Sequence, residues 1–526
     1  MGSSQFLVYG KQHCILQDRK AVRESLLHSF GNSGMMKIIK PTHSILAFLP
    51  LKKRDSMNYI IFMPDEMRAE SVGCYGHPFV QTPNLDRLAQ QGTLFEQCHV
   101  QNPVCSPCRC SFATGQYPHT NGHRTLWNLV KPYEHNLFRY MKEAGYDVWV
   151  YGKNDLFAAD TIPLSADVFV EKQAVHPPAE KPESATGNID DFLLEPMHCG
   201  EDGVKDYANV MAGIEKILGW KPGDKPFVLF LPLLYPHCPY TAPEDYYHLY
   251  EEEQISLRGI GEGKPEFHEL IRRYRSLNDP EALRKVQAVY LSMITYSDAL
   301  LGKLMDALDH SAAAENTLLI AVSDHGDYAG DYGLVEKWPD GFEDVLTHVP
   351  LIVRGPGVKA GHRVRGQVEL LDLMPTFLES AGIEPQHTFF GKSLWPALRG
   401  GNGDLERVVY GDGGYDLHEP HCFEGWGTRD ADLMYPGGVY YHKALQQQEH
   451  PLSVCRTTMM RTLDYKLIYR TSGECEFYDL KKDPKELENV YDNEKYTKRI
   501  QQMQNKLLNW YVKTSDTVPM TSDSRE

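Results

Sequence analysis

The segment 102–115, NPVCSPCRCSFATG, places three thiols within six positions: Cys105, Cys108 and Cys110. Such a cluster suits a zinc site, a disulfide hub, a set of half-buried thiols on a core helix, or one special nucleophile. A structural zinc site needs four ligands, a set that Cys98 and His99 would have to complete. On a helix, however, the third thiol lies about 140° around the axis from the first, which argues against a shared ion. The cytoplasm, where we expect this protein, is a reducing compartment, which argues against disulfides.

The spacing around the first thiol favours an anion-processing site. Ser106 and Pro107 suit a first helical turn, where proline sacrifices no hydrogen bond. Cys105 would then stand at the positive end of that helix, where anions are stabilised. Arg109, four residues on, shares its face and can fork onto two oxygens of a tetrahedral anion. We therefore expect a reactive group at position 105 with a fixed guanidinium beside it.

Four apolar runs predict the strands that position these groups: residues 58–63, 146–151, 226–234 and 316–323. Helical patterns such as 135–145 and 281–309 alternate with them, which predicts an α/β sheet covered by helices on both faces. Polar side chains follow the four strands at once: Asp65 and Glu66, Lys153 and Asp155, His237, and Asp324 with His325. Since ligands of open α/β sheets bind beyond the carboxyl ends of the strands, these side chains should meet at one edge.

The chain has 526 residues, more than one core usually supports, so we expect a large domain and a smaller one. The predicted parts are a peripheral N-terminal extension (1–56), a catalytic α/β domain (57–404), a smaller α+β domain (405–515) and a tail (516–526). In the smaller domain, TMMRTLDYKLIYR and CEFYDL predict paired strands, and a helix over about 493–512 closes it. Two stretches, 171–205 and 411–455, are predicted to be long loops that act as lids or specificity elements.

The composition excludes several function classes. A net charge of −17 argues against nucleic acid, and it requires a local cluster of lysine and arginine around any anionic substrate. Eleven cysteines in a chain of this length do not make a disulfide scaffold. The first 20 residues lack the pattern of a signal peptide, and the apolar run 44–51 is too short to span a bilayer. We therefore expect a cytoplasmic protein with reduced thiols and no membrane contact.

The order C-S-P-C-R, then S-F-A-T-G, resembles the signature of the type I sulfatases, the formylglycine-dependent family of the alkaline phosphatase superfamily. Further matches follow in the family's order, among them MPDEMRAESVGCYG, YPHCPY and SDHGDYAGDYGLVEK. The resemblance runs from about Asn58 to about Asn489. It implies an alkaline-phosphatase-like fold, with a large, mixed, mostly parallel sheet between helices and a smaller C-terminal α+β domain.

In this family a maturation enzyme oxidises the signature cysteine to formylglycine, which the resemblance implies for Cys105. One hydroxyl of the hydrated aldehyde attacks sulfur, and the other drives the aldehyde to re-form, so that sulfate leaves without a separate attacking water. The resemblance also implies one divalent cation, Ca²⁺ in preference to Mg²⁺ or Mn²⁺. Its implied ligands are Asp65, Glu66, the modified Cys105, Asp324 and His325. Glu66 stands where many members have Asp, so it either ligates the cation or turns away from it.

The same resemblance assigns Arg109, Lys153 and Lys337 to the sulfate oxygens, where they would neutralise the charge that develops there. His237 and Lys337 would lie near the ester oxygen, so that either one protonates the leaving alcohol. No further cofactor is predicted. The expected partners are a small sulfated substrate and the maturation enzyme, without nucleic acid or membrane.

One element departs from the family's pattern. Sulfatases commonly show G-K-x-H after the second strand, whereas this chain has Gly152-Lys153-Asn154-Asp155. Phosphonate monoester and phosphodiester hydrolases of the same superfamily usually lack that histidine, which makes them the alternative function. Lys153 favours a sulfatase acting on a sulfate monoester of an aryl, alkyl or sugar alcohol. An inactive sulfatase-like binding protein is a third hypothesis, against which the intact nucleophile and metal carboxylates argue.

Overall fold

An eight-stranded sheet with the order β10-β2-β9-β7-β1-β6-β4-β5 forms the centre of the fold. The computed structural model describes residues 57–525 except 175–188, 428–430 and 437. Among these residues, β9 runs antiparallel to both neighbours in the sheet, and the other pairings are parallel. The strands are β1 (Asn58–Met63), β2 (Thr93–Phe95), β4 (Asp147–Tyr151), β5 (Val168–Val170), β6 (Phe227–Pro232), β7 (Thr317–Val322), β9 (Leu351–Arg354) and β10 (His362–Val364). The predicted mixed, mostly parallel sheet is therefore confirmed.

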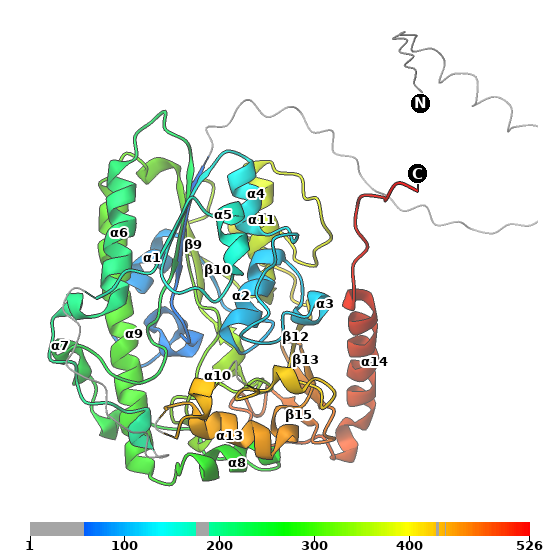
Figure 1. Ribbon diagram of the computed structural model, residues 1–526. Helices are drawn as coiled ribbons and strands as arrows, with labels where there is room; N and C mark the ends of the chain where they lie inside the picture. Colours follow the sequence, from blue (N-terminus) through cyan, green and yellow to red (C-terminus); the bar gives the residue numbers. More distant parts are fainter. Residues whose placement is uncertain (1–56, 175–188, 428–430, 437, 526) are drawn as a thin grey trace, which may run out of the picture. The chain divides into compact units, whose positions relative to one another are not determined.

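Helices cover both faces of this sheet (Figure 1). One face carries α1 (Pro83–Gln91), α6 (Lys205–Gly219) and α9 (Pro280–Asp309), and the other carries α2 (Cys105–Thr114), α4 (Leu137–Glu143) and α11 (Leu373–Ala381). Successive side chains of a strand alternate between the two cores. In β1, Ile60 and Phe62 pack in the first core, whereas Tyr59, Ile61 and Met63 pack in the second. Burial on both faces explains why β1 is a continuous apolar run.

The four strands predicted from apolar runs are β1, β4, β6 and β7, and they are neighbours in the sheet in the order β7-β1-β6-β4. The predicted helix 281–309 is α9, which begins at Pro280 after Asp279 accepts a hydrogen bond from the Glu281 N–H. The predicted helix 135–145 is the shorter α4. The remaining short helices of this region are α3 (Pro118–Asn121), α5 (Ile162–Ser165), α7 (Glu244–Tyr247), α8 (Glu266–Tyr274), α10 (Asp344–Thr347) and α12 (Trp395–Leu398).

A four-stranded antiparallel sheet forms the smaller C-terminal domain. Its order is β12-β13-β14-β15, with bounds Val409–Gly413, Thr457–Arg461, Tyr465–Arg470 and Glu476–Asp479. On one face, Leu507 and Trp510 of α14 (Thr497–Thr514) pack against Met460 and Leu467 of the sheet. The other face packs against Phe342, which lies just before α10 (Asp344–Thr347). The predicted smaller α+β domain is confirmed, while the limits given to it and to the other parts stay predictions.

Part of the predicted loop 411–455 is helical, so that prediction was wrong there. Helix α13 (Tyr441–Glu449) lies within it. Apart from Ala444, the buried residues of α13 are polar: Lys443, Gln446 and Gln447. A search for apolar residues at helical spacing passes over such a helix, because its buried face carries amides and an ammonium group.

Several predictions fall wholly or partly outside the described residues. The extension 1–56 is one of them, and the predicted loop 171–205 includes the undescribed stretch 175–188.

A third, three-stranded sheet joins β11 (Val368–Glu369), β3 (Cys98–His99) and β8 (His348–Val349). Of the helices in the described part of the chain, none combines the length and apolar character needed to cross a bilayer.

Candidate active site

Four neighbouring strands end at the same edge of the main sheet, and each delivers polar side chains there. Asp65 and Glu66 follow β1, Lys153 and Asp155 follow β4, His237 follows β6, and Asp324 and His325 follow β7. The side chains of Lys153 and Asp155 are 18% and 24% exposed, and the other five residues are buried. The polar side chains that were expected to meet beyond the ends of these strands therefore do so in the structure.

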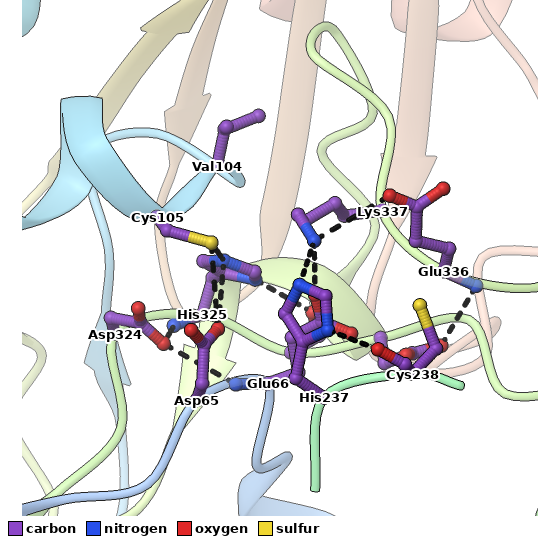
Figure 2. Close-up of polar contacts among 12 residues, drawn as sticks. Asp65, Glu66, Val104, Cys105, His237, Cys238, Asp324, His325, Glu336 and Lys337 are labelled. Carbon is purple, nitrogen blue, oxygen red and sulfur yellow. Dashed lines mark hydrogen bonds and ion pairs between the residues drawn. The ribbon is translucent and has the colours of Figure 1, made fainter. Parts of the chain in front are cut away.

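Helix α2 brings Cys105 to this edge. Val104 precedes it in an extended conformation as the N-cap residue. Cys105 Sγ lies 3.2 Å from His325 Nε2 and 3.5 Å from Asp65 Oδ1 (Figure 2). Lys153 Nζ stands 3.9 Å from the same sulfur. Burial raises the pKa of the Cys105 thiol well above its usual value, so the unmodified side chain is a poor nucleophile here.

The other two thiols of the segment point elsewhere. Cys108 Sγ donates to the carbonyl oxygen of Asp324 at 2.7 Å, and Cys110 Sγ lies 3.8 Å from the carbonyl oxygen of Leu156. The cysteines that the structure describes are free thiols. Among the described residues, the metal-type cluster that includes Cys105 contains neither neighbouring thiol. The disulfide hub and the shared zinc site are therefore not formed.

Four of the five predicted metal ligands make one cluster. Asp65, Glu66, Cys105 and His325 each offer a ligand atom, and these atoms lie within 4.8 Å of one another. Glu66 has a φ of 68°, and the Tyr290 hydroxyl donates to its carbonyl oxygen at 2.6 Å. Glu66 Oε2 is buried and has no hydrogen-bond partner within the described structure. A carboxylate oxygen without a donor, beside a second carboxylate and an imidazole, fits a divalent cation.

Asp324, the fifth predicted ligand, organises the backbone beside this cluster. Its Oδ1 accepts hydrogen bonds from the N–H groups of Glu66 and His325 at 3.3 and 2.9 Å. Its Oδ2 accepts from Arg109 Nε at 2.8 Å, and Arg109 Nη2 donates to Asp65 Oδ2 at 3.0 Å. The guanidinium therefore forks onto two carboxylates rather than onto an open anion position, because it is fully buried between them. Although burial alone would lower it, these carboxylates raise the pKa of Arg109 above its usual value.

Lys153 owes its position to the glycine before it. Gly152 has a φ of 143°, and a Cβ there would lie 2.1 Å from the carbonyl oxygen of Pro232 on β6. The Lys153 N–H donates to the same carbonyl at 3.0 Å. Its ammonium group then bridges Asp65 Oδ2 at 2.5 Å and Asp155 Oδ2 at 2.9 Å. Burial alone would lower the pKa of Lys153, but Asp155 and Asp65 hold it well above its usual value.

Lys337, His237 and Glu66 form a second polar group (Figure 2). Lys337 Nζ lies 2.8 Å from His237 Nε2 and forms an ion pair with Glu66 Oε1, which is 3.2 Å from the same imidazole nitrogen. The other ring nitrogen contacts the carbonyl oxygen of Cys238. Burial, with the ammonium groups of Lys337 and Lys153, holds the pKa of His237 well below its usual value. The imidazole is therefore neutral, and its Nε2 accepts from Lys337.

Cys105, Lys153, His237 and Lys337 line a pocket of about 390 Å³. Besides two leucines, Leu126 and Leu433, its wall contains five polar or aromatic residues that were not predicted from the sequence: Trp127, Glu336, Glu424, Tyr440 and Lys443. Glu336 adjoins a predicted site residue, which is the one signal that the sequence contained. Three of the others come from the stretch predicted as a loop, where Lys443 Nζ pairs with Glu336 at 2.8 Å and with Glu424 at 3.7 Å.

Comparisons with known proteins agree with this geometry. The family model described as Sulfatase matches residues 57–383, and N-sulphoglucosamine sulphohydrolase, C-terminal, matches residues 428–513. The chain is 24% identical over 492 residues to an arylsulfatase of Clostridium perfringens, which covers 86% of this chain and 93% of that protein. It is 28% identical over 392 residues to the iduronate 2-sulfatase of Homo sapiens, a match that covers 63% of this chain and 70% of that protein.

A solved structure shares the fold. The phosphonate monoester hydrolase of Agrobacterium radiobacter superposes with a TM-score of 0.68 and 22% identity, covering 87% of this chain and 96% of that chain. At this identity the likeness concerns the fold alone. The sulfatase model, in contrast, spans more than half of the sequence. The chain therefore belongs to the sulfatase family of sulfuric ester hydrolases, within the alkaline phosphatase superfamily.

Proposed function

We propose that this protein hydrolyses a sulfate monoester of an aryl, alkyl or sugar alcohol, with formylglycine at position 105 as the nucleophile. The observation that carries the proposal is the setting of Cys105. Its sulfur contacts Asp65, His325 and Lys153, and it lines a pocket together with Lys153 and Lys337. Cations beside the nucleophile suit an anionic ester. The names of the two sulfatase relatives support sulfate as the group that is removed.

The residues have separate tasks in this proposal. Lys153 and Lys337 bind the free oxygens of the ester and neutralise the charge that develops on them. Arg109 holds two of the proposed metal ligands, Asp65 and Asp324, through its fork of hydrogen bonds. His237 and Lys337, with 2.8 Å between Nε2 and Nζ, form the pair that delivers a proton to the leaving alcohol.

Asp65, Glu66, Asp324 and His325, with the modified Cys105, would hold one divalent cation, and Ca²⁺ is the proposed ion because most donors are oxygen atoms. When bound, the cation supplies Lewis-acid polarisation at position 105. Formylglycine hydrate supplies an attacking hydroxyl and a second hydroxyl through which the aldehyde is regenerated. A maturation enzyme in the same compartment, for which we propose the cytoplasm, has to oxidise Cys105.

Peptide mass spectrometry combined with a hydrolysis assay tests the proposal. The peptide should carry an aldehyde at Cys105 and thiols at Cys108 and Cys110, because only the first thiol has Pro107 and Arg109 two and four residues downstream. Protein with this aldehyde and stoichiometric metal should hydrolyse 4-nitrophenyl sulfate, which excludes an inactive binding protein. Full activity with an unmodified thiol at position 105 would contradict the mechanism.

Asp155 favours one second candidate, a phosphonate monoester or phosphodiester hydrolase. It stands where sulfatases commonly have histidine, and it lines the pocket beside Lys153. The steady-state kcat/KM for 4-nitrophenyl sulfate, compared with that for 4-nitrophenyl phenylphosphonate, decides between the two. A higher value for the sulfate supports the sulfatase, and a higher value for the phosphonate supports the alternative.

A further inference from the structure

Asp155 is a charged residue of the pocket to which the proposed mechanism gives no task. Its Oδ2 lies 2.9 Å from Lys153 Nζ and 3.8 Å from Arg109 Nη1, and its side chain is 24% exposed. The lysine that it contacts stands 3.9 Å from Cys105 Sγ. Asp155 therefore places a negative charge next to a cation that has to bind an anion. This arrangement weakens the binding of anions by Lys153, and the size of the effect depends on the charge of the anion.

The turn that carries Asp155 is fixed independently of the ion pair. Asn154 Oδ1 accepts hydrogen bonds from the N–H groups of Phe157 and Leu156 at 3.0 and 3.3 Å. Asn154 Nδ2 donates to the carbonyl oxygen of Phe157 at 2.9 Å, and both Leu156 and Phe157 are buried in the core. The backbone thus holds the carboxylate beside Lys153.

The two carboxylates around Lys153 differ in their roles. Asp65, 2.5 Å from Nζ, belongs to the described metal-type cluster. Asp155 belongs to neither of the metal-type groups found among the described residues. Its charge is therefore not required for a cation, and its effect falls on the ammonium group and on whatever anion that group binds.

The substrate and the product of sulfate ester hydrolysis differ in charge, although both present a tetrahedral sulfur group. The ester carries one negative charge, and inorganic sulfate carries two at neutral pH. Because Coulomb energy is proportional to charge, Asp155 opposes the product about twice as strongly as the substrate. A pocket built only for tight anion binding would instead retain its dianionic product.

We propose that Asp155 is a specificity-determining residue that sets the charge selectivity of this pocket. It weakens the hold of Lys153 on dianions, so monoanionic esters are favoured and inorganic sulfate is released. The same charge disfavours phosphate monoesters, which are largely dianionic at pH 7.5. The inference rests on the proposed hydrolysis of sulfate esters, and it gives Asp155 an electrostatic role without proton transfer.

The test compares two tetrahedral anions of different charge on the full-length, metal-loaded enzyme: methanesulfonate, with one negative charge, and inorganic sulfate, with two. Calorimetry gives the Kd of each for the wild type, Asp155→Asn, Asp155→Glu and Asp160→Asn. Asp160 is the matched control, because it is exposed on the same segment and its substitution changes the net charge equally. In Asp155→Asn, the Kd should fall about fivefold for methanesulfonate and about 25-fold for sulfate. Asp155→Glu and Asp160→Asn should keep the wild-type ratio.

Equal tightening of both anions, two unchanged Kd values, or the same shift in Asp160→Asn would overturn the proposal. So would a fall in kcat of about 100-fold in Asp155→Asn with unchanged selectivity, since that loss is the mark of proton transfer. Calorimetry needs no turnover, so the binding ratios decide the role of Asp155 even for an enzyme that hydrolyses no sulfate ester. Asp155→Ser removes the same charge and replaces Asp155→Asn if that variant does not fold.

Discussion

Two clusters of buried charge lie along one short segment, residues 336–344, and they differ in what surrounds them. The first, at Glu336 and Lys337, lines the active-site pocket. The second, at Asp340, joins the catalytic fold to the β12–β15 sheet through Arg470 of β14, whose Nη1 lies 2.8 Å from Asp340 Oδ2. Both clusters contain acids and bases that the chain withdraws from water.

The difference lies in what borders each cluster, because both keep a buried carboxylate oxygen without a hydrogen-bond partner in the described structure, Glu66 Oε2 in the first and Asp340 Oδ1 in the second. Arg470 also donates to the carbonyl oxygen of Asp340 and to Glu476 Oε2, each at 2.6 Å, and its side chain is 1% exposed. In the first cluster, Lys337 borders a pocket of about 390 Å³. Hydrogen-bonding capacity left open beside a pocket indicates ligand binding, whereas buried charge enclosed away from the pocket indicates a structural role.

Asp324→Asn should produce the largest effect on the first cluster. Asp324 is a predicted ligand, and it also accepts from Arg109 and from the N–H groups of Glu66 and His325. We expect loss of the bound cation and a fall in kcat of at least about 10³-fold, because a metal ion supplies several kcal/mol of transition-state stabilisation. Elemental analysis and hydrolysis of 4-nitrophenyl sulfate measure these losses, and thermal melting checks the fold. Retained cation and activity would show that the metal assignment is wrong.

His237→Ala should lower kcat more than it raises KM, because the pair that His237 forms with Lys337 delivers a proton to the leaving oxygen in the transition state. The loss should be about 10²–10⁴-fold on an alkyl or sugar sulfate and much smaller on 4-nitrophenyl sulfate, whose leaving group needs no proton. His248→Ala, at an exposed position nearby in the sequence, serves as the control. An equal loss on both substrates would leave His237 as a positioning residue.

Much of the first cluster could be predicted, because its members follow strands that are buried on both faces. Such strands are continuous apolar runs, so Asn58–Met63 and Thr317–Val322 were evident. The rule that ligands bind beyond the carboxyl ends then brought Asp65, Asp324 and His237 together. Pro107 and Arg109 after Cys105 identified the nucleophile position through the family resemblance.

The rest of the site depends on tertiary packing that no local pattern records. Lys443 reaches the pocket from α13, whose buried face is polar and therefore has no apolar period. Arg109 was expected to bind an anion. Its Nε and Nη2 donate to Asp324 and Asp65, which follow distant strands, while its buried Nη1 has no hydrogen-bond partner in the described structure. The second cluster was missed for the same reason, since Asp340 and its partner on β14 are 130 residues apart in the sequence.

Arg470→Leu should destabilise the protein by about 3–5 kcal/mol, because it leaves Asp340 buried without its cation and Glu476 with Lys264 alone, at 3.7 Å. The kcat of the folded enzyme at 25 °C should stay within about twofold of the wild type, since Asp340, Arg470 and Glu476 do not line the active-site pocket. Thermal melting and initial rates measure the two effects. Lys498→Leu, which changes an exposed cation of α14, is the control. A fall in kcat at temperatures where the variant is still folded would mean that the second cluster affects catalysis. That result would contradict its purely structural role.

The smallest effect concerns Asp206, a buried carboxyl that supports the turn before His237. It accepts hydrogen bonds from the N–H groups of Leu234 and Tyr235, at 2.9 and 2.8 Å. Burial raises the pKa of Asp206 from 3.8 to about 6 in spite of these hydrogen bonds. The folded state therefore binds this proton more tightly than the unfolded chain does. Its contribution to stability is complete below about pH 4 and is lost as the pH rises through about 6.

Asp206→Asn keeps an acceptor oxygen for the two N–H groups but cannot ionise, so it should remove this part of the pH dependence. Relative to the variant, the wild type should lose stability between about pH 4 and pH 7, by at most about 3 kcal/mol. Melting temperatures of both proteins across this range measure the difference, with Asp245→Asn, at an exposed position, as the control. If the difference in melting temperature between the wild type and Asp206→Asn does not change with pH, the hydrogen bonds offset the effect of burial and Asp206 is already ionised at pH 4. The turn before His237 would then be held by a charged acceptor, and buried charge would support the active site without opening onto its pocket.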